Sequence, residues 1–363
     1  MESQKKQPFF SIVMPAYKVE KYIGKAIKSI LRQTFPDWEL IVVDDCSPDR
    51  SREIAAAYAK EDDRICVLCQ EENRGVSAAR NLGIEKACGK YIWFMDSDDH
   101  ADSDLLEAAF ESLKRNPARL VVFGLQEEYY GRDGTFRYRH EILPKERYYS
   151  DKESLRKEII YLEQSTLYGY VWNKMYELEY LRALNMEYVD YEDAKFIEDI
   201  LFNVKYCMDI DSMNILAAAP YHYQKRLDDS LTNEFVPDYY RLHRKRIQMI
   251  YKQYRHWNLC TDEVRQILGS LYGRYLLSAL QRNCDPRSHM NCSARYHWCR
   301  MAIRQPLFEE LIPYARPKDS KTLAAALCVL KRKNIPVCLL MGRIVYICKE
   351  KLPTVYSKVK SGR

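Results

Sequence analysis

Hydrophobic residues follow two different spacings in the first hundred positions of the chain. Largely apolar runs of four to six residues are typical of strands buried on both faces of a sheet, and they occupy residues 9–14, 38–43, 65–68 and 91–95. Between them, apolar residues recur every three or four positions, as on one face of a helix, and the predicted helices span residues 19–33, 52–60 and 78–86. This alternation predicts an α/β fold with a Rossmann-like, mostly parallel sheet flanked by helices.

The spacing is less regular after residue 110. The predicted elements are a strand over residues 120–123, a polar, tyrosine-rich hairpin or loop over 126–147, a helix over 152–163 and a last strand over 215–223. From about residue 237 the pattern becomes helical and basic. We therefore expect one large domain over residues 8–235, with halves at 8–110 and 111–235, and a helical carboxyl-terminal region over residues 236–363.

Acidic residues directly follow two of the predicted strands. Asp44 and Asp45 end the second strand, and Asp96, Asp98 and Asp99 end the fourth. Ligands of open α/β sheets bind beyond the carboxyl ends of the strands, and clustered carboxylates favour a hard divalent cation such as Mg²⁺ or Mn²⁺. Taken alone, the triplet is more typical of a solvated loop that caps a following helix. The second pair of acids favours a binding site instead.

The composition describes a chain with an ample core. Of 363 residues, 47% are hydrophobic, and 30% are charged, as in a soluble protein. We expect no signal peptide, because Pro15 ends the first apolar run, and no transmembrane helix, which needs roughly 20 apolar residues. The twelve cysteines have no regular spacing, and Cys66 and Cys69 form a lone pair. We therefore expect reduced core fillers in a cytoplasmic protein rather than zinc ligands.

The usual phosphate-binding loops are absent from the sequence. No Gly-x-x-x-x-Gly-Lys-Ser/Thr motif occurs, and no Gly-x-Gly-x-x-Gly motif follows the first strand. If one acidic strand end holds a metal and the other holds a base or ribose, the two would bind a nucleoside diphosphate. Its phosphates must then be neutralised by the metal and by scattered basic residues such as Arg74 or Arg80.

Five sequence segments occur in the order found in one enzyme family. They are PAY at residues 15–17, SILRQT at 29–34, VDDCSPD at 43–49, NRGVSAARNLG at 73–83 and DSDD at 96–99. Over roughly residues 8–110 the chain resembles the amino-terminal half of a family 2 glycosyltransferase of the GT-A fold. Weaker matches are WNK at 172–174, ED at 198–199, YQKR at 223–226 and SLT at 230–232. No resemblance extends beyond about residue 235.

The resemblance implies an inverting transfer of a sugar from a nucleotide-diphosphate sugar, usually a UDP-sugar, to an acceptor hydroxyl. The acceptor would be a saccharide or a lipid-linked molecule in the synthesis of a bacterial surface polysaccharide or glycolipid, and Mn²⁺ or Mg²⁺ would be the cofactor. The implied roles are base contact for Asp45, a pocket border for Pro15, Ala16 and Tyr17, substrate contact for Asp96, metal ligation for Asp98 and general-base catalysis for Asp199. Arg80 is expected to contact the substrate as one of the scattered basic residues.

Some of these assignments have alternatives. Lys18 replaces the Asn that the family commonly has after Pro-x-Tyr, so the resemblance does not define the detailed contacts of the nucleotide pocket. Asp199 would also stabilise the first turn of a helix as a simple capping charge. Trp172 and Lys174 read as a packing residue and a surface salt-bridge residue, with an acceptor-lining role as the alternative.

Two other functions fit parts of the pattern. A sugar-phosphate nucleotidyltransferase also uses a nucleotide-binding α/β domain, but usually has a glycine-rich loop that residues 12–22 lack. The second alternative is a non-catalytic nucleotide-sugar-binding module. Such a module does not need every acid of the motifs, so the retention of these acids in the chain argues against it. Nucleic-acid binding is not expected, because the basic charge has no interleaved aromatic stacking pattern.

The basic charge is concentrated in the tail. Residues 316–363 hold twelve Lys/Arg and two acids, a net charge of +10, which leaves −4 for the preceding 315 residues. Two apolar stretches, residues 322–330 and 335–348, flank the cations at 331–333. Neither is long enough to span a bilayer. They predict a segment in the membrane interface, drawn to anionic lipid at the inner face of the cell membrane; helices that only cover the catalytic domain are the alternative.

Overall fold

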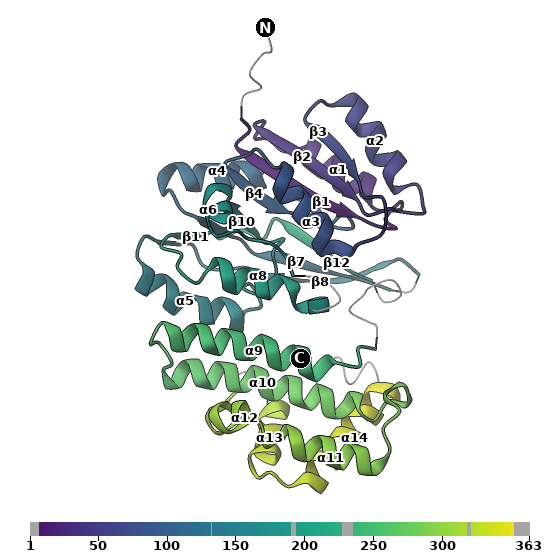
Figure 1. The fold of residues 1–363 in the computed structure, drawn as a ribbon, viewed down its shortest axis with the longest axis vertical. Coiled ribbons are helices and arrows are strands. Elements are labelled where there is room, and N and C mark those ends of the chain that lie inside the picture. The colour runs from purple at the N-terminus through teal and green to yellow at the C-terminus, as the bar shows by residue number, and fades with distance from the viewer. Residues whose placement is uncertain (1–6, 132, 190–193, 227–234, 318–320, 352–363) are drawn as a thin grey trace. The chain divides into compact units, whose positions relative to one another are not determined.

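The computed structural model describes residues 7–131, 133–189, 194–226, 235–317 and 321–351. The chain forms two compact units, residues 1–234 and 235–363, so the boundary lies one residue from the position expected from the sequence. The first unit is an α/β domain and the second is helical (Figure 1).

An eight-stranded sheet forms the centre of the first unit. Its order is β3-β2-β1-β4-β10-β6-β11-β9. The strands are β1 (Phe10–Ala16), β2 (Trp38–Asp44), β3 (Ile65–Cys69), β4 (Tyr91–Phe94), β6 (Leu120–Val122), β9 (Arg147–Tyr149), β10 (Lys174–Glu177) and β11 (Met213–Ile215). The strands β1 to β4 pair in parallel, as predicted, whereas β10 and β9 add antiparallel pairs from the second half. All residues of β1 and β4 are buried, which explains their unbroken apolar sequence.

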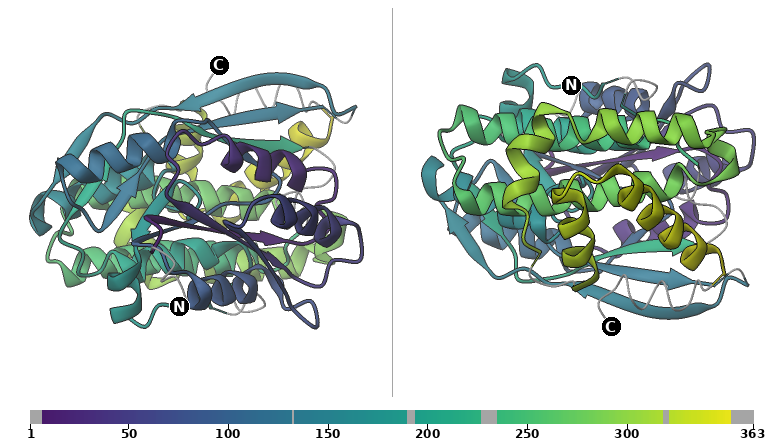
Figure 2. Two further views of the ribbon diagram at one scale, coloured as in Figure 1. Left: turned by 90° about the horizontal axis from the view of Figure 1, so that it is seen from above. Right: turned by 90° about the horizontal axis from the view of Figure 1, so that it is seen from below.

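Helices cover both faces of this sheet (Figure 2). They are α1 (Ile23–Leu31), α2 (Ser51–Glu61), α3 (Gly75–Lys86), α4 (Leu105–Arg115), α5 (Lys152–Gln164), α6 (Leu178–Ala183) and α8 (Glu198–Tyr206). The helix predicted over residues 19–33 is shorter in the structure, because residues 20–22 form a turn before the helix begins at Ile23. A side chain at Gly83 would place its Cβ 2.2 Å from Val13 Cγ1, so this glycine lets α3 pack closely on β1.

A second sheet, of order β5-β12-β7-β8, lies beside the strand ends. Its strands are β5 (His100–Ala101), β7 (Leu125–Tyr130), β8 (Phe136–Ile142) and β12 (Tyr221–Arg226). The predicted polar hairpin is present as β7 and β8, which pair antiparallel. The prediction of a single strand over residues 215–223 is wrong, since β11 and β12 lie in different sheets. Pro220 lies between them and has no N–H to continue a ladder.

The second unit consists of helices around α10. They are α9 (Tyr239–His256), α10 (Asp262–Arg282), α11 (Cys292–Ala302), α12 (Pro306–Leu311), α13 (Lys321–Lys331) and α14 (Ile335–Lys351). The helices α9 and α10 lie side by side, and α13 and α14 also pack on α10 (Figures 1 and 2). Within the described ranges, none of the helices combines the length and the apolar character that crossing a membrane requires.

All twelve cysteines are free thiols. The expectation that they fill the core is wrong for half of them: the exposed ones are Cys46, Cys66, Cys69, Cys88, Cys292 and Cys328. The pair Cys66 and Cys69 lies on β3, the edge strand of the large sheet. The two side chains point to opposite faces of the strand, and both are exposed.

Candidate active site

The strand order places the two acid-bearing strand ends on either side of β1. Asp44 and Asp45 lie at the end of β2, and the Asp96 loop follows β4, while β1 pairs with both strands. The order of the parallel strands reverses between β1 and β4, which is where open α/β sheets bind ligands. Pro15 and Ala16 are buried at the end of β1, whereas the Tyr17 side chain beyond them is 41% exposed.

Asp45 is bound to the start of α3. Its carboxylate accepts hydrogen bonds from the backbone N–H groups of Arg74 and Gly75, both at 2.8 Å, and from Gln70 Nε2 at 2.9 Å. The two backbone donors belong to the amino terminus of α3, which favours negative charge. Burial nevertheless raises the pKa of Asp45. The structure therefore gives Asp45 a capping role, and its contact with a nucleotide base remains a prediction.

Arg80 on α3 joins the two acidic groups of the site. Its Nη1 lies 2.7 Å from Asp199 Oδ1 and its Nη2 lies 3.0 Å from Asp96 Oδ1. Glu198 Oε1 lies 3.8 Å from the same Nη1. Arg80 is only 3% exposed. Its guanidinium is thus directed at protein carboxylates, which favours a positioning role over direct contact with a diphosphate.

Asp199 lies in the first turn of α8, where the sequence predicts a helix to begin with an acid pair. Burial raises the pKa of Asp199, and the Arg80 charge only partly offsets this effect. Burial also raises the pKa of Glu198, to about 8. Glu198 Oε2 is buried without a hydrogen-bond partner among the residues that the structure describes. A raised pKa makes an ionised carboxylate a stronger proton acceptor, and this favours Asp199. With a pKa of about 8, Glu198 is mostly protonated at neutral pH and must lose its proton before it can act as a base.

Asp98 lies at the exposed edge of the site. Arg226 Nη1 is 3.0 Å from Asp98 Oδ2, and Arg226 Nη2 donates to the Asp98 carbonyl at 2.9 Å. The Arg226 guanidinium also lies over the Tyr22 ring, 3.7 Å from its centroid. Arg226 belongs to the YQKR segment of the resemblance, but the sequence indicates no role for it. The SLT segment that follows lies outside the described residues.

The carboxylates of Asp96 and Asp98 fit a divalent cation. Their side chains are 29% and 43% exposed, so they remain reachable while they form ion pairs with arginines. Partial desolvation of the carboxyl group, together with the negative charge of Asp96, raises the pKa of Asp98. A cation beside them would relieve this repulsion, and hard oxygen donors suit Mg²⁺ or Mn²⁺.

Asp99, the third acid of the DSDD motif, has a structural role. It is 1% exposed and accepts hydrogen bonds from Tyr221 Oη and from the Gln224 N–H, each at 2.8 Å. Both donors lie on β12. Asp99 therefore fastens the second sheet to the end of β4, and this fixes the position of Arg226 two residues further on.

The prediction for Trp172 is confirmed, whereas the prediction for Lys174 is wrong. Trp172 packs, as expected, between Tyr170 and Tyr221, with both ring centroids 4.5 Å away. Lys174 is not a surface residue: it is fully buried, and its Nζ donates to the carbonyl of Leu167 at 2.6 Å. The reason is that β10, which contains Lys174, lies between β4 and β6 inside the sheet.

Beside the site, the second sheet holds a group of titratable residues that the sequence analysis did not single out. His222 Nδ1 lies 2.9 Å from Glu128 Oε1, and His222 Nε2 lies 2.9 Å from Asp102 Oδ1. Burial alone would lower the pKa of His222, but the hydrogen bonds to these two carboxylates raise it. The His100 ring stacks on His222 with an interplanar angle of 17°. Nearly parallel imidazoles do not direct their lone pairs at one point, so the group is an ion-pair network rather than a metal centre.

Sequence comparison decides the family. The family described as Glycosyl transferase family 2 matches residues 11–181. The uncharacterized glycosyltransferase EpsJ of Bacillus subtilis (strain 168) is 30% identical over 329 residues, which cover 88% of this chain and 92% of EpsJ. The chain belongs to glycosyltransferase family 2. The resemblance read from the five segments is thereby confirmed.

Solved structures show the same fold. The crystal structure of S. aureus TarS 1-349 in complex with UDP matches with a TM-score of 0.62 at 21% identity, covering 98% of this chain and 92% of that one. Its complex with UDP-GlcNAc has a TM-score of 0.60 at 20% identity, with the same coverage. TarS of Staphylococcus aureus (strain Mu50 / ATCC 700699) is named a poly(ribitol-phosphate) beta-N-acetylglucosaminyltransferase. It is 25% identical over 240 residues, 65% of this chain and 39% of TarS. The predicted GT-A fold is thereby confirmed.

Proposed function

We propose that this family 2 glycosyltransferase transfers a sugar from a UDP-sugar to a saccharide or lipid-linked acceptor hydroxyl, with inversion and with Mn²⁺ or Mg²⁺. The observation that carries the proposal is the buried Arg80, which ties the proposed base Asp199 to Asp96 of the strand-end motif. The UDP and UDP-GlcNAc complexes of TarS support this donor class. The name of TarS, a poly(ribitol-phosphate) beta-N-acetylglucosaminyltransferase, supports a polymer with free hydroxyl groups as acceptor.

The departing diphosphate needs positive charge close to the end of β4. Asp98, with Asp96 beside it, would hold the divalent cation, which when bound supplies the charge that stabilises the leaving group. Arg226 is the nearest basic side chain to Asp98, at 3.0 Å, and its stacking on Tyr22 keeps it at this edge. We assign Arg226 to the same side of the donor as Asp98, as a second source of positive charge.

The acceptor hydroxyl must lose its proton as it attacks the sugar. A single inverting displacement needs one base, unlike the two-carboxylate mechanism of retaining hydrolases. Asp199 is held by Arg80 through Oδ1, and its raised pKa favours proton uptake. Glu198 is the second candidate for the base, because its Oε2 is buried and has no hydrogen-bond partner among the described residues.

We propose a cytoplasmic location for the reaction. The free state of all twelve thiols supports a reducing compartment. The nucleotidyltransferase alternative loses its support, because the family match and the missing glycine-rich loop both oppose it. A non-catalytic binding module remains distinguishable from an enzyme only by activity.

The test incubates the purified protein with Mn²⁺ and a panel of nucleotide sugars and measures release of the nucleoside diphosphate. We expect slow hydrolysis of one preferred donor, and faster release when a saccharide acceptor is added. Asp199→Asn and Glu198→Gln, assayed in parallel, identify the base, and NMR of the product anomeric proton reports inversion. If the unmodified protein turns over no donor faster than the Asp98→Asn variant does, an enzymatic function is contradicted.

A further inference from the structure

The helix α14 (Ile335–Lys351) has one packed face. Cys338 is fully buried and Gly342 is buried on the same side of the helix. A Cβ at Gly342 would lie 3.0 Å from the carbonyl oxygen of Leu280 on α10, so the two helices approach each other closely. This contact fixes which side of α14 faces outward.

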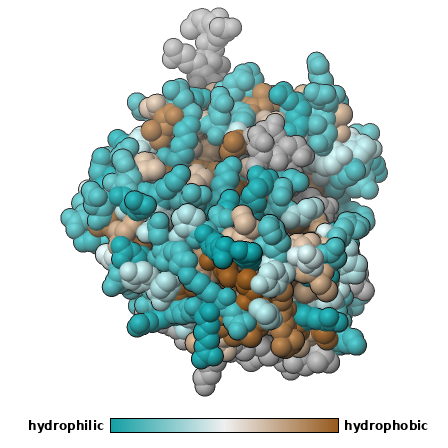
Figure 3. Space-filling model, turned by 60° about the horizontal axis from the view of Figure 1, so that its bottom comes forward, coloured by the Kyte–Doolittle hydropathy of each residue, from teal (hydrophilic) through white to brown (hydrophobic). Residues whose placement is uncertain are grey.

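The outward face is apolar. Val337, Leu340, Ile344 and Ile347 are 42%, 58%, 52% and 41% exposed, and their spacing of three, four and three residues makes one continuous stripe. Figure 3, in which the lower end of Figure 1 is turned forward, shows a group of apolar side chains on that side of the molecule. Single exposed apolar residues are common, but a contiguous patch marks an interaction surface.

Cations lie around this stripe. Arg332 and Lys333 precede α14, Arg343 is adjacent to Ile344, and Lys351 follows the last residue of the stripe by one turn. All four are exposed, although Lys333 also pairs with Glu309. In the sequence, residues 316–363 carry a net charge of +10. The patch therefore combines an apolar stripe with an excess of positive charge.

We propose that the exposed face of α14 binds the surface of an anionic phospholipid bilayer. The helix would lie in the plane of the interface with the apolar stripe inserted among the lipid chains, and the flanking cations would contact the headgroups. The partner is identified by the combined chemistry, since an apolar stripe edged by cations complements a surface that is apolar below and anionic above. This binding requires no donor or transfer, so it stands independently of the proposed function.

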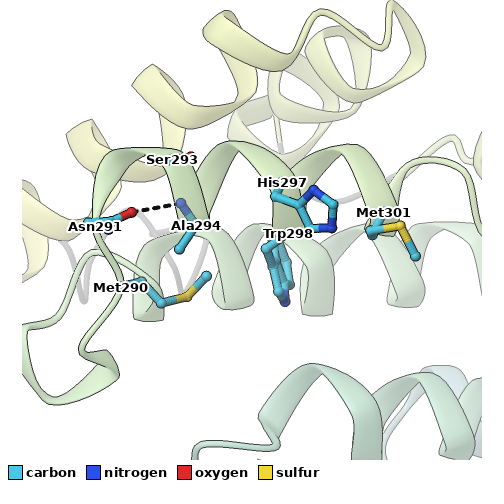
Figure 4. A pocket seen from close by; sticks show the side chains of 7 residues that line it. All are labelled: Met290, Asn291, Ser293, Ala294, His297, Trp298 and Met301. Atoms are coloured by element: carbon cyan, nitrogen blue, oxygen red, sulfur yellow. Dashed lines mark hydrogen bonds between the residues drawn. The ribbon is translucent and has the colours of Figure 1, made fainter.

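The hollow on α11 is a separate feature of the same unit. It is lined by Met290, Asn291, Ser293, Ala294, His297, Trp298 and Met301 (Figure 4). Asn291 Oδ1 accepts the Ala294 N–H there and caps α11. The hollow is shallow and has no acidic or basic side chain apart from His297, so it does not explain the charge excess around α14.

Point substitutions test the proposal better than a truncation. Deleting residues from 321 onward would remove Leu327, which packs on α10 at Gly273, and would expose the core of the helical unit. In contrast, the double variant Leu340→Asp/Ile344→Asp changes only exposed positions. The control Phe136→Asp/Leu143→Asp places the same two charges at positions of similar exposure, 51% and 55%, in the first unit.

The full chain is sedimented with vesicles of phosphatidylglycerol and phosphatidylcholine, and with phosphatidylcholine alone, at low and high salt. We expect the protein to bind the anionic vesicles at low salt and to lose most of this binding at high salt. For the α14 double variant, the fraction of protein bound to vesicles should be at least about tenfold smaller. The control variant should bind like the unmodified protein, and both variants should hydrolyse the soluble donor normally.

Three results would overturn the proposal. They are no binding of the unmodified protein to anionic vesicles at low salt, equal binding of the α14 variant, and equal loss in both double variants. Sedimentation velocity tests the competing partner, a second copy of the chain. If the unmodified protein is a dimer that does not bind vesicles, and Leu340→Asp/Ile344→Asp dissociates this dimer, the face is an interface between two copies. Because vesicle binding is measured without donor, its failure is distinct from a failure of the proposed function.

Discussion

Each of the two units contains an arrangement of side chains that is costly in free energy, and the two arrangements differ. In the α/β unit, charges are buried and held in place: Arg80 is 3% exposed between Asp96 and Asp199. In the helical unit, aliphatic side chains such as Leu340 and Ile344 are more than half exposed. Both arrangements cost free energy in an isolated chain. This contrast underlies our two proposals, that the α/β unit holds the active site and that the helical unit binds a membrane surface.

Asp98→Asn should produce the largest effect on transfer. The neutral amide keeps the shape of the side chain but weakens the proposed metal site, which then no longer shields the departing diphosphate. We expect transfer to be abolished with an unchanged melting curve, because the Asp98 side chain is partly exposed. Normal turnover at limiting Mn²⁺, with unchanged metal affinity, would show that Asp98 is not the ligand.

Arg80→Met should disrupt the buried charges themselves. Removing one partner of a buried ion pair typically costs about 3–5 kcal/mol, because the remaining charges stay unpaired. Arg64→Met is the control, since Arg64 pairs with Asp62 at a more exposed position and should change stability by about 1 kcal/mol or less. Urea unfolding measures both. Equal stability losses for the two variants would mean that the Arg80 cluster is not desolvated as the structure shows.

Asp199→Asn should separate catalysis from binding. Donor and metal binding should survive, because the residue is proposed to act only on the acceptor proton, while transfer falls at least about a hundredfold. Glu198→Gln is the matched comparison on the same turn of α8. If Glu198→Gln loses more transfer than Asp199→Asn, the assignment of the base passes to Glu198; loss of donor binding in Asp199→Asn would exclude its role as a base.

Glu128→Gln should lower stability in a limited pH window, by about 1.5–3 kcal/mol for a hydrogen bond between charged groups. The hydrogen bond from His222 lowers the pKa of Glu128 to about 2, so its contribution is present above pH 4.5 and is lost as the pH falls toward 2. The raised pKa of His222 contributes below pH 6.5 and is lost as the pH rises through the folded-state value.

The difference between wild type and Glu128→Gln should therefore be largest between about pH 4.5 and 6.5. Thermal unfolding across pH measures it. Glu141→Gln, at an exposed position of β8, should shift stability by no more than about 0.5 kcal/mol at any pH. A constant difference from pH 3 to 9 would mean that Glu128 and His222 are not a charged pair.

The smallest effect is expected on the outward face of α14. Leu340→Asp should change stability by no more than about 0.5 kcal/mol, because the side chain is 58% exposed. Gly342→Leu, two residues away on the packed face, should cost about 1–3 kcal/mol through overpacking against Leu280. Similar stability losses in both variants would show that the two faces of α14 do not differ, and would remove the contrast between the two units.

The sequence alone determined the features that depend on neighbouring residues. Strands β1 to β4 and helices α2 and α3 follow from local patterns, because an unbroken apolar run or a 3.6-residue period is contained within each element. The position of the acids directly after strands follows in the same way, as does the acid pair that begins α8. The family motifs lie in this region, which is why the fold and the family were predicted from it.

Only the tertiary structure decided which side chains meet. Arg80 contacts Asp199, 119 residues away, and Arg226 contacts Asp98, 128 residues away. Those pairs depend on the strand order and on the attachment of β12 to Asp99, neither of which has a periodic signature. For the same reason, Lys174 proved buried rather than exposed, since β10 entered the middle of the sheet. In α14, the sequence showed an apolar segment, but the approach of Gly342 to Leu280 decided which of its residues face outward.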